Sequence, residues 1–67
     1  MSKIESLQLI FESQPEGGFV VTSPLLPELI TEGDTIQEAL ENAEDALTAI
    51  IEGFEELGKP LPPILQP

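Results

Sequence analysis

Carboxylates are the side chains of this sequence that are numerous enough to do chemistry or to bind a charged partner. Thirteen Asp and Glu residues stand against two Lys, the net charge is −11, and there is no His and no Cys. These absences exclude a thiol nucleophile, a His-dependent triad and a zinc site of the usual kind. Carboxylates alone can hold a hard metal ion, act as a paired acid and base, or attract a basic protein.

The spacing of the carboxylates favours binding over catalysis. Seven of them fall in one stretch with helical periodicity, on the side opposite the apolar stripe, where side chains are normally solvated. Glu41 and Asp45 are four residues apart, as are Glu52 and Glu56, and like charges at that spacing cost roughly 0.2–0.5 kcal/mol per pair. A basic partner would relieve this repulsion. The alternative is that so small a cost is simply tolerated.

The acidic balance also restricts the partners and the cofactors. A nucleic-acid backbone or an anionic membrane surface would repel the chain, because both are bound through Lys and Arg. No apolar run approaches the roughly 20 residues of a membrane span, and no signal peptide is visible, so we expect a cytoplasmic protein. No phosphate-binding loop or calcium-loop spacing is present, and we therefore predict no cofactor and no metal.

The elements that position the carboxylates begin with a hairpin. Alternating apolar residues predict a strand within Lys3–Glu12. The segment Ser13–Gly18 has the composition of a turn, with one Pro and two Gly, and the β-rich run Phe19–Thr22 follows it. A Pro-bracketed connection then leads to a third short strand, which we expect at Glu28–Glu32.

The most clearly patterned element is a helix over residues 35–57. Apolar residues recur in alternating steps of four and three from Ile36 to Leu57, which is an amphipathic stripe. Thr35 and Glu38 have the spacing of a capping box, and Gly58 is a natural helix stop. The same step also suits a coiled coil, but a stripe of about three heptads is the bare minimum for one.

We expect one α+β domain over residues 1–67, with strands within residues 3–32, the helix, and a Pro-rich tail at residues 59–67. The order β-β-β-α(-β) predicts an antiparallel sheet covered on one face by a single long helix. The tail is predicted to be an extended arm or a short edge strand. Because the second sheet face and the tail stay uncovered, we expect a homo-oligomer. Its predicted interface comprises Ile10, Val20, Ile30, Ile64 and Leu65.

Three ordered segments make this sequence similar to a known family. They read EGGFVVTSPLLP at residues 16–27, TEGDTIQEALENA at residues 31–43 and GKPLPP at residues 58–63. In these segments the chain resembles the HicB antitoxin family. The resemblance implies a β-β-β-α-β domain similar to a truncated RNase H fold. It also implies a toxin–antitoxin pair, in which the HicB-like protein sequesters HicA, a small basic mRNA-cleaving toxin, by masking its active site.

The sequence departs from the family pattern in two places. Glu28-Leu29 stand where Gly-Cys is usual, and the chain ends at Pro67 without the helix-turn-helix or ribbon-helix-helix segment that many members use on operator DNA. We therefore expect no direct contact with nucleic acid. Nothing in the sequence identifies a cognate toxin.

The leading prediction is thus a non-catalytic protein that binds a basic HicA-like RNase. The carboxylates predicted to contact it are Glu16, Glu41, Asp45, Glu52 and Glu56. One alternative is an orphan acidic, homo-oligomeric binding or structural domain with another partner. A second is an enzyme with an RNase H-like carboxylate metal site, which would need an Asp at the centre of the first strand, where the sequence offers only Glu5 and Glu12.

Overall fold

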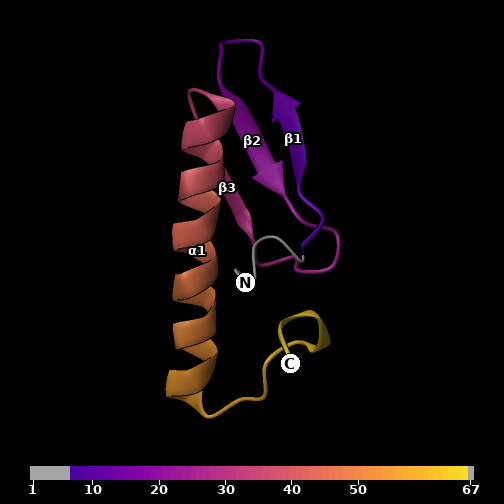
Figure 1. Ribbon diagram of the computed structural model, residues 1–67, viewed down its shortest axis with the longest axis vertical. Helices are drawn as coiled ribbons and strands as arrows, with labels where there is room; N and C mark the ends of the chain where they lie inside the picture. The colour runs from indigo at the N-terminus through magenta and orange to yellow at the C-terminus, as the bar shows by residue number, and fades with distance from the viewer. Residues whose placement is uncertain (1–6, 67) are drawn as a thin grey trace.

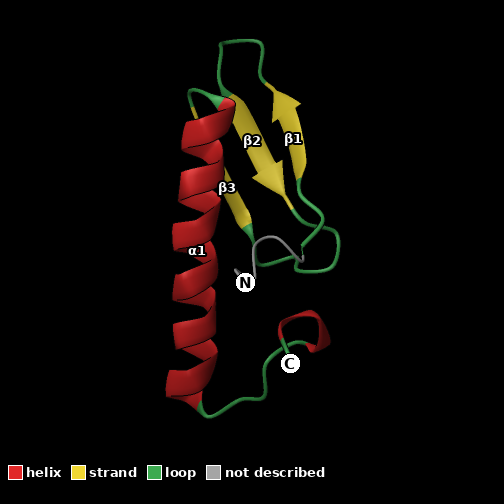
Figure 2. Ribbon diagram, in the orientation of Figure 1, coloured by secondary structure: helices red, strands yellow, loops and turns green. Residues whose placement is uncertain are grey.

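The computed structural model describes residues 7–66 and shows three strands, one long helix and a final single turn of 3-10 helix (Figures 1 and 2). In chain order these are β1 (Ile10–Ser13), β2 (Phe19–Thr22), β3 (Ile30–Gly33), α1 (Ile36–Leu57) and η2 (Pro63–Leu65). The predicted α+β class is confirmed. No helix within the described residues is long and apolar enough to cross a membrane.

The strands form one antiparallel sheet in the order β1-β2-β3. The predicted hairpin is confirmed. Its turn is closed by Gly17 N–H donating to Gln14 O at 2.9 Å and Gln14 N–H donating to Gly18 O at 3.0 Å. Gly17 and Gly18 have φ of 102° and 81°, backbone conformations that residues with a side chain rarely adopt. The turn therefore favours glycine at both positions.

Both outer strands start later than predicted. The first strand was predicted within Lys3–Glu12, a segment whose start lies outside the described residues, and in the described part β1 begins only at Ile10. β3 begins at Ile30, because Leu29 before it is fully buried and its N–H donates to Leu26 O in a turn at 2.9 Å. The connection before β3 therefore supplies core residues, which the sequence analysis missed.

The strand register assigns residues to two faces of the sheet, since side chains alternate along a strand. The inner face includes Phe11, Phe19 and Val21, and Val21 is fully buried. The outer face carries two rows that cross all three strands: Ile10, Thr22 and Ile30 in one, and Glu12, Val20 and Glu32 in the other.

Helix α1 begins and ends as its capping residues predict. Thr35 is the N-cap, and its Oγ1 accepts a hydrogen bond from Glu38 N–H at 3.0 Å. Glu38 Oε1 in turn accepts from Asp34 N–H at 2.7 Å, which completes the capping box. Gly58 follows the helix with φ of 67° and its N–H donates back into the last turn, so the predicted stop is confirmed.

The helix packs along β3 and reaches β2 with the middle of its predicted apolar stripe, while residues at the two ends of the stripe stay exposed (Figure 1). Its buried residues are Ala39, Ala43 and Leu47. Leu40 and Ile36, which belonged to the predicted apolar stripe, are 37% and 55% exposed. The helix backbone lies close to the sheet at this end, because the small side chains of the alanines allow it. The larger side chains of Ile36 and Leu40 therefore lie at the edge of the contact.

A close approach at Gly33 shows how tight this packing is. A Cβ atom added to Gly33 would lie 2.7 Å from Ala39 Cα and 2.9 Å from the carbonyl carbon of Glu38. Nearby, the Asn42 side-chain amide donates to Glu32 O at 2.7 Å. These contacts hold the first half of α1 against the last residues of β3.

The tail folds back onto the core, which corrects the prediction of an extended arm or an edge strand (Figure 1). Leu65 is only 1% exposed, and Leu61 and Ile64 are half-buried against the core. The turn is closed by Leu65 N–H donating to Pro62 O at 2.9 Å and by the Gln66 side chain donating to Leu61 O at 2.7 Å. Proline lacks the N–H that a sheet ladder needs, but it fits the first position of a helical turn.

Candidate functional site

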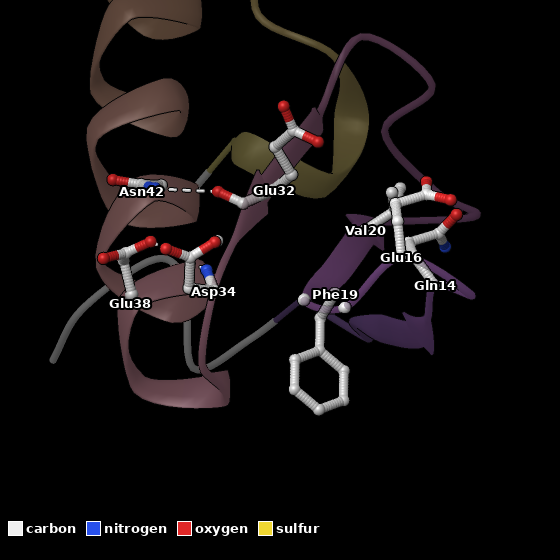
Figure 3. A pocket seen from close by; sticks show the side chains of 11 residues that line it. Gln14, Glu16, Phe19, Val20, Glu32, Asp34, Glu38 and Asn42 are labelled. Atoms are coloured by element: carbon white, nitrogen blue, oxygen red, sulfur yellow. Dashed lines mark hydrogen bonds between the residues drawn. The ribbon is translucent and has the colours of Figure 1, made fainter.

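An open cleft of about 390 Å³ lies where the hairpin turn, the end of β3 and the start of α1 meet (Figure 3). We call it the acidic cleft, because four of its lining residues are carboxylates: Glu16, Glu32, Asp34 and Glu38. Val20 on the outer face of the sheet supplies apolar surface, and Asn42 supplies an amide. In Figure 3 Glu16 and Val20 lie on one side of this cleft and Asp34 and Glu38 on the other.

Local structure explains how these carboxylates come together from distant parts of the sequence. Glu16 is carried by the hairpin turn, whose base approaches the end of β3 so closely that a Cβ on Gly18 would lie 2.9 Å from Gly33 O. Glu32 points outward from β3, because the paired residue on β2, Val20, lies on the outer face. Asp34 is held at the helix start by its capping bond to Glu38.

The acidic cleft has the chemistry of a site for a cationic side chain. All four carboxylate residues are exposed, and Asp34 and Glu38 lie beside the N-terminus of α1, whose dipole favours negative charge there. Charge-assisted hydrogen bonds to Lys or Arg are the strongest contacts such oxygens make. Within residues 7–66 no group of three acidic residues converges in a way that would hold a metal ion.

The structure separates the five carboxylates that were predicted to bind a partner. Glu16 lines the acidic cleft, whereas Glu41 and Asp45 are exposed further along α1. Glu52 and Glu56 line a different open cleft near the end of the helix. Glu41 and Glu56 are 15 residues apart, or about 22 Å along a helix axis, so the set does not form one compact site.

The apolar residues predicted to form an oligomer interface divide into two groups. Ile10, Val20 and Ile30 share the outer sheet face, with Ile10 41% and Ile30 68% exposed. Ile64 is half-buried against the core of its own chain. The prediction for Leu65 is wrong, because its side chain is only 1% exposed inside that core and so cannot contact another chain.

Sequence reasoning missed three of the four carboxylates of the acidic cleft. Glu32 was treated as the end of a strand, and Glu38 as part of a helix cap. Their proximity to Glu16 depends on the strand register, which pairs Val20 with Glu32. The available signal was the pair of glycine-containing breaks at Gly17-Gly18 and Gly33-Asp34, which mark the two chain reversals at one end of the sheet.

Comparisons with known proteins identify the family. No protein-family profile matches the chain. The chain is 45% identical over 51 residues to Antitoxin HicB 1 of Photorhabdus laumondii, and 40% identical over 48 residues to Antitoxin HicB of Escherichia coli K12. These matches cover 76% and 72% of this chain but 33% and 35% of those proteins, so the chain spans about a third of their length.

A third relative is similar in size. The chain is 35% identical over 54 residues to UPF0150 protein Ta0767 of Thermoplasma acidophilum, a match that covers 81% of this chain and 78% of that protein. A relative of matching length and two larger antitoxins thus share this segment, in agreement with the motifs of the sequence and the β-β-β-α fold. The chain belongs to the HicB-like antitoxin family.

Proposed function

We propose that this protein is an antitoxin-like binding protein that sequesters a small basic HicA-type mRNA-cleaving toxin in the cytoplasm and masks its active site. The observation that carries the proposal is its identity of 40–45% to two proteins named as HicB antitoxins. In this proposal residues 1–67 act as a single HicB-like unit that catalyses no reaction, and inhibition follows from occupancy alone.

The charge of the chain gives an independent physical reason for a basic partner. A net charge of −11 on 67 residues attracts a cationic protein over long distances and speeds the encounter. This attraction is screened beyond a Debye length of about 8 Å at physiological ionic strength, so association should slow as salt is added. An RNase also needs cationic side chains to hold its substrate. A carboxylate surface that pairs with those side chains competes directly with RNA.

The second candidate is an acidic homo-oligomeric domain with a different partner. It is favoured by the exposure of Ile10 and Ile30, since exposed apolar residues on one sheet face often mark an interface. The two candidates differ in a measurable way, because an antitoxin suppresses an RNase whatever its own oligomeric state.

Co-expression with a small basic HicA-type protein, sought first among the neighbouring genes, tests the proposal. We expect the protein to restore growth of cells that express the toxin and to co-purify with it as a complex. The control is a partner variant without RNase activity, which should still co-purify but leave growth unaffected. If the two proteins neither co-purify nor restore growth at matched expression, the antitoxin proposal is wrong.

A further inference from the structure

The outer face of the sheet is an apolar surface that the described part of the chain leaves open. Its first row places Ile10 and Ile30 on either side of Thr22, and these isoleucines are 41% and 68% exposed. Adjacent strands lie about 4.8 Å apart, so the row extends roughly 10 Å across the sheet, which is the diameter of one helix. Helix α1 packs on the opposite face.

Carboxylates border this apolar row along one side. The neighbouring row places Val20 between Glu12 and Glu32, and both glutamates are exposed. Val20 and Glu32 also line the acidic cleft, so the row and the cleft form one continuous surface. Protein interfaces with useful affinity combine an apolar centre with a polar rim. The outer face has that composition.

The exposed face of α1 is less suited to be the main contact. The side chains one helical turn from Glu41 and Asp45 are polar apart from Ala49. Ile36 and Leu40 are 55% and 37% exposed, but helical spacing places them to one side of this charged surface. Exposed ion pairs contribute at most a little affinity, because water and salt screen them. We therefore expect the helix carboxylates to act mainly on the rate of encounter and the sheet face to supply most of the affinity.

We propose that the outer sheet face, namely Ile10, Ile30, Glu12, Glu32 and the adjoining acidic cleft, is the docking surface for a basic amphipathic helix of the partner. The apolar stripe of that helix lies across the two isoleucines. Its flanking Lys and Arg side chains reach Glu12, Glu32 and the cleft. This inference rests on the proposed function for the identity of the partner, but the surface itself is testable without a toxin.

A second copy of the chain is a poorer occupant of this surface than a basic helix. Each copy carries a net charge of −11, and face-to-face pairing would bring Glu12 and Glu32 of one copy near the same row of the other. Like charges brought together in an interface oppose association. Charge complementarity selects the basic partner.

The test uses a 14-residue peptide with Leu at helical spacing on one face and Lys elsewhere, and a scrambled peptide of the same composition. Binding is measured by calorimetry at about 0.15 M and 0.5 M salt. We expect the wild-type protein to prefer the ordered peptide by about tenfold or more. Replacing Ile10 and Ile30 by Thr should remove this preference. Leu57→Gln should keep it, because Leu57 is 70% exposed at the far end of α1.

A second pair of variants separates local contact from overall charge. Glu12→Lys with Glu32→Lys, and Glu41→Lys with Asp45→Lys, both change the net charge from −11 to −7, since each reversal adds two positive charges. The sheet pair should weaken binding of the ordered peptide at least about fivefold more than the helix pair. Circular dichroism confirms folding. Ile30→Thr alone is the fallback where the double isoleucine variant does not fold.

Three results would overturn the inference: an unchanged preference in the isoleucine variants, a larger loss in the helix pair, or a wild-type dimer that Ile30→Thr converts to a monomer. The co-expression assay keeps the two proposals distinct. If the isoleucine variants protect cells as well as the wild type, this docking surface is wrong while the antitoxin proposal stands. If peptide binding follows the sheet face but no toxin is suppressed, the surface stands and the antitoxin proposal is wrong.

Discussion

Replacing Gly33 by Ala tests how the acidic cleft is built. Gly33 ends β3 directly before Asp34, and its Cα faces the backbone of α1. The added methyl carbon would lie 2.7 Å from Ala39 Cα, whereas carbon atoms in contact normally lie about 3.5–4.0 Å apart. The obstacle is helix backbone and not a flexible side chain. The helix must therefore move away from the sheet by several tenths of an ångström or more.

The magnitude of the effect follows from the size of the domain. Overpacking of this kind costs about 1–3 kcal/mol. A chain of 67 residues has an unfolding free energy of about 3–10 kcal/mol, at roughly 0.05–0.15 kcal/mol per residue. One kcal/mol shifts the melting temperature of so small a domain by about 4–8 °C. We expect Gly33→Ala to lower the melting temperature by about 5–20 °C.

The measurement is thermal unfolding followed by circular dichroism, with Gly53→Ala as the matched control. Gly53 lies inside α1, and an added Cβ there has no atom within 4 Å. Replacing a helical glycine by alanine stabilises by about 0.5–1 kcal/mol, so this variant should melt a few degrees higher. Equal melting temperatures for Gly33→Ala and the wild type would show that the helix does not pack tightly against Gly33. That result would contradict the position of α1 beside the acidic cleft.

Three further substitutions and one control, Leu25→Ala, test the packing, the helix cap and a buried hydroxyl by the same unfolding measurement. Leu65→Ala should lower the unfolding free energy by about 2–5 kcal/mol, because this tail residue is buried. Leu25→Ala, at a 58% exposed position, is the control and should have little effect. Similar small losses for both variants would show that the tail does not pack on the core. Thr35→Ala should cost about 1 kcal/mol through loss of the helix N-cap, and an unchanged stability would contradict the capping bond. Ser23→Ala should be neutral or stabilising, since the buried Ser23 hydroxyl has no hydrogen-bond partner among the described residues, and a loss above about 1 kcal/mol would reveal one.

Local chemistry made part of this fold predictable. The helix was located within one residue because Thr35, Glu38 and Gly58 act through bonds to their own neighbours in the sequence. The hairpin was predictable for the same reason, since two adjacent glycines supply the positive φ values of its turn. Such signals need no knowledge of the rest of the molecule.

Features that depend on contacts between distant segments were not predictable in this way. Leu26 and Leu65 belong to Pro-rich segments without hydrophobic periodicity, yet both are buried once the chain folds back on itself. At its start α1 buries Ala39 and not the larger Ile36 and Leu40, because its backbone lies close to Gly33. The acidic cleft joins residues from three elements, so it required the strand register.

The most direct test of the central claim is a titration of toxin activity. A purified small basic toxin of the HicA type that co-purifies with this chain is assayed for cleavage of an RNA substrate while this protein is added. We expect cleavage to fall to background near one equivalent, and the excess required to increase with salt because the encounter is electrostatic. Undiminished cleavage at a tenfold molar excess and low salt would contradict the account, because a chain that leaves the RNase active does not mask its site.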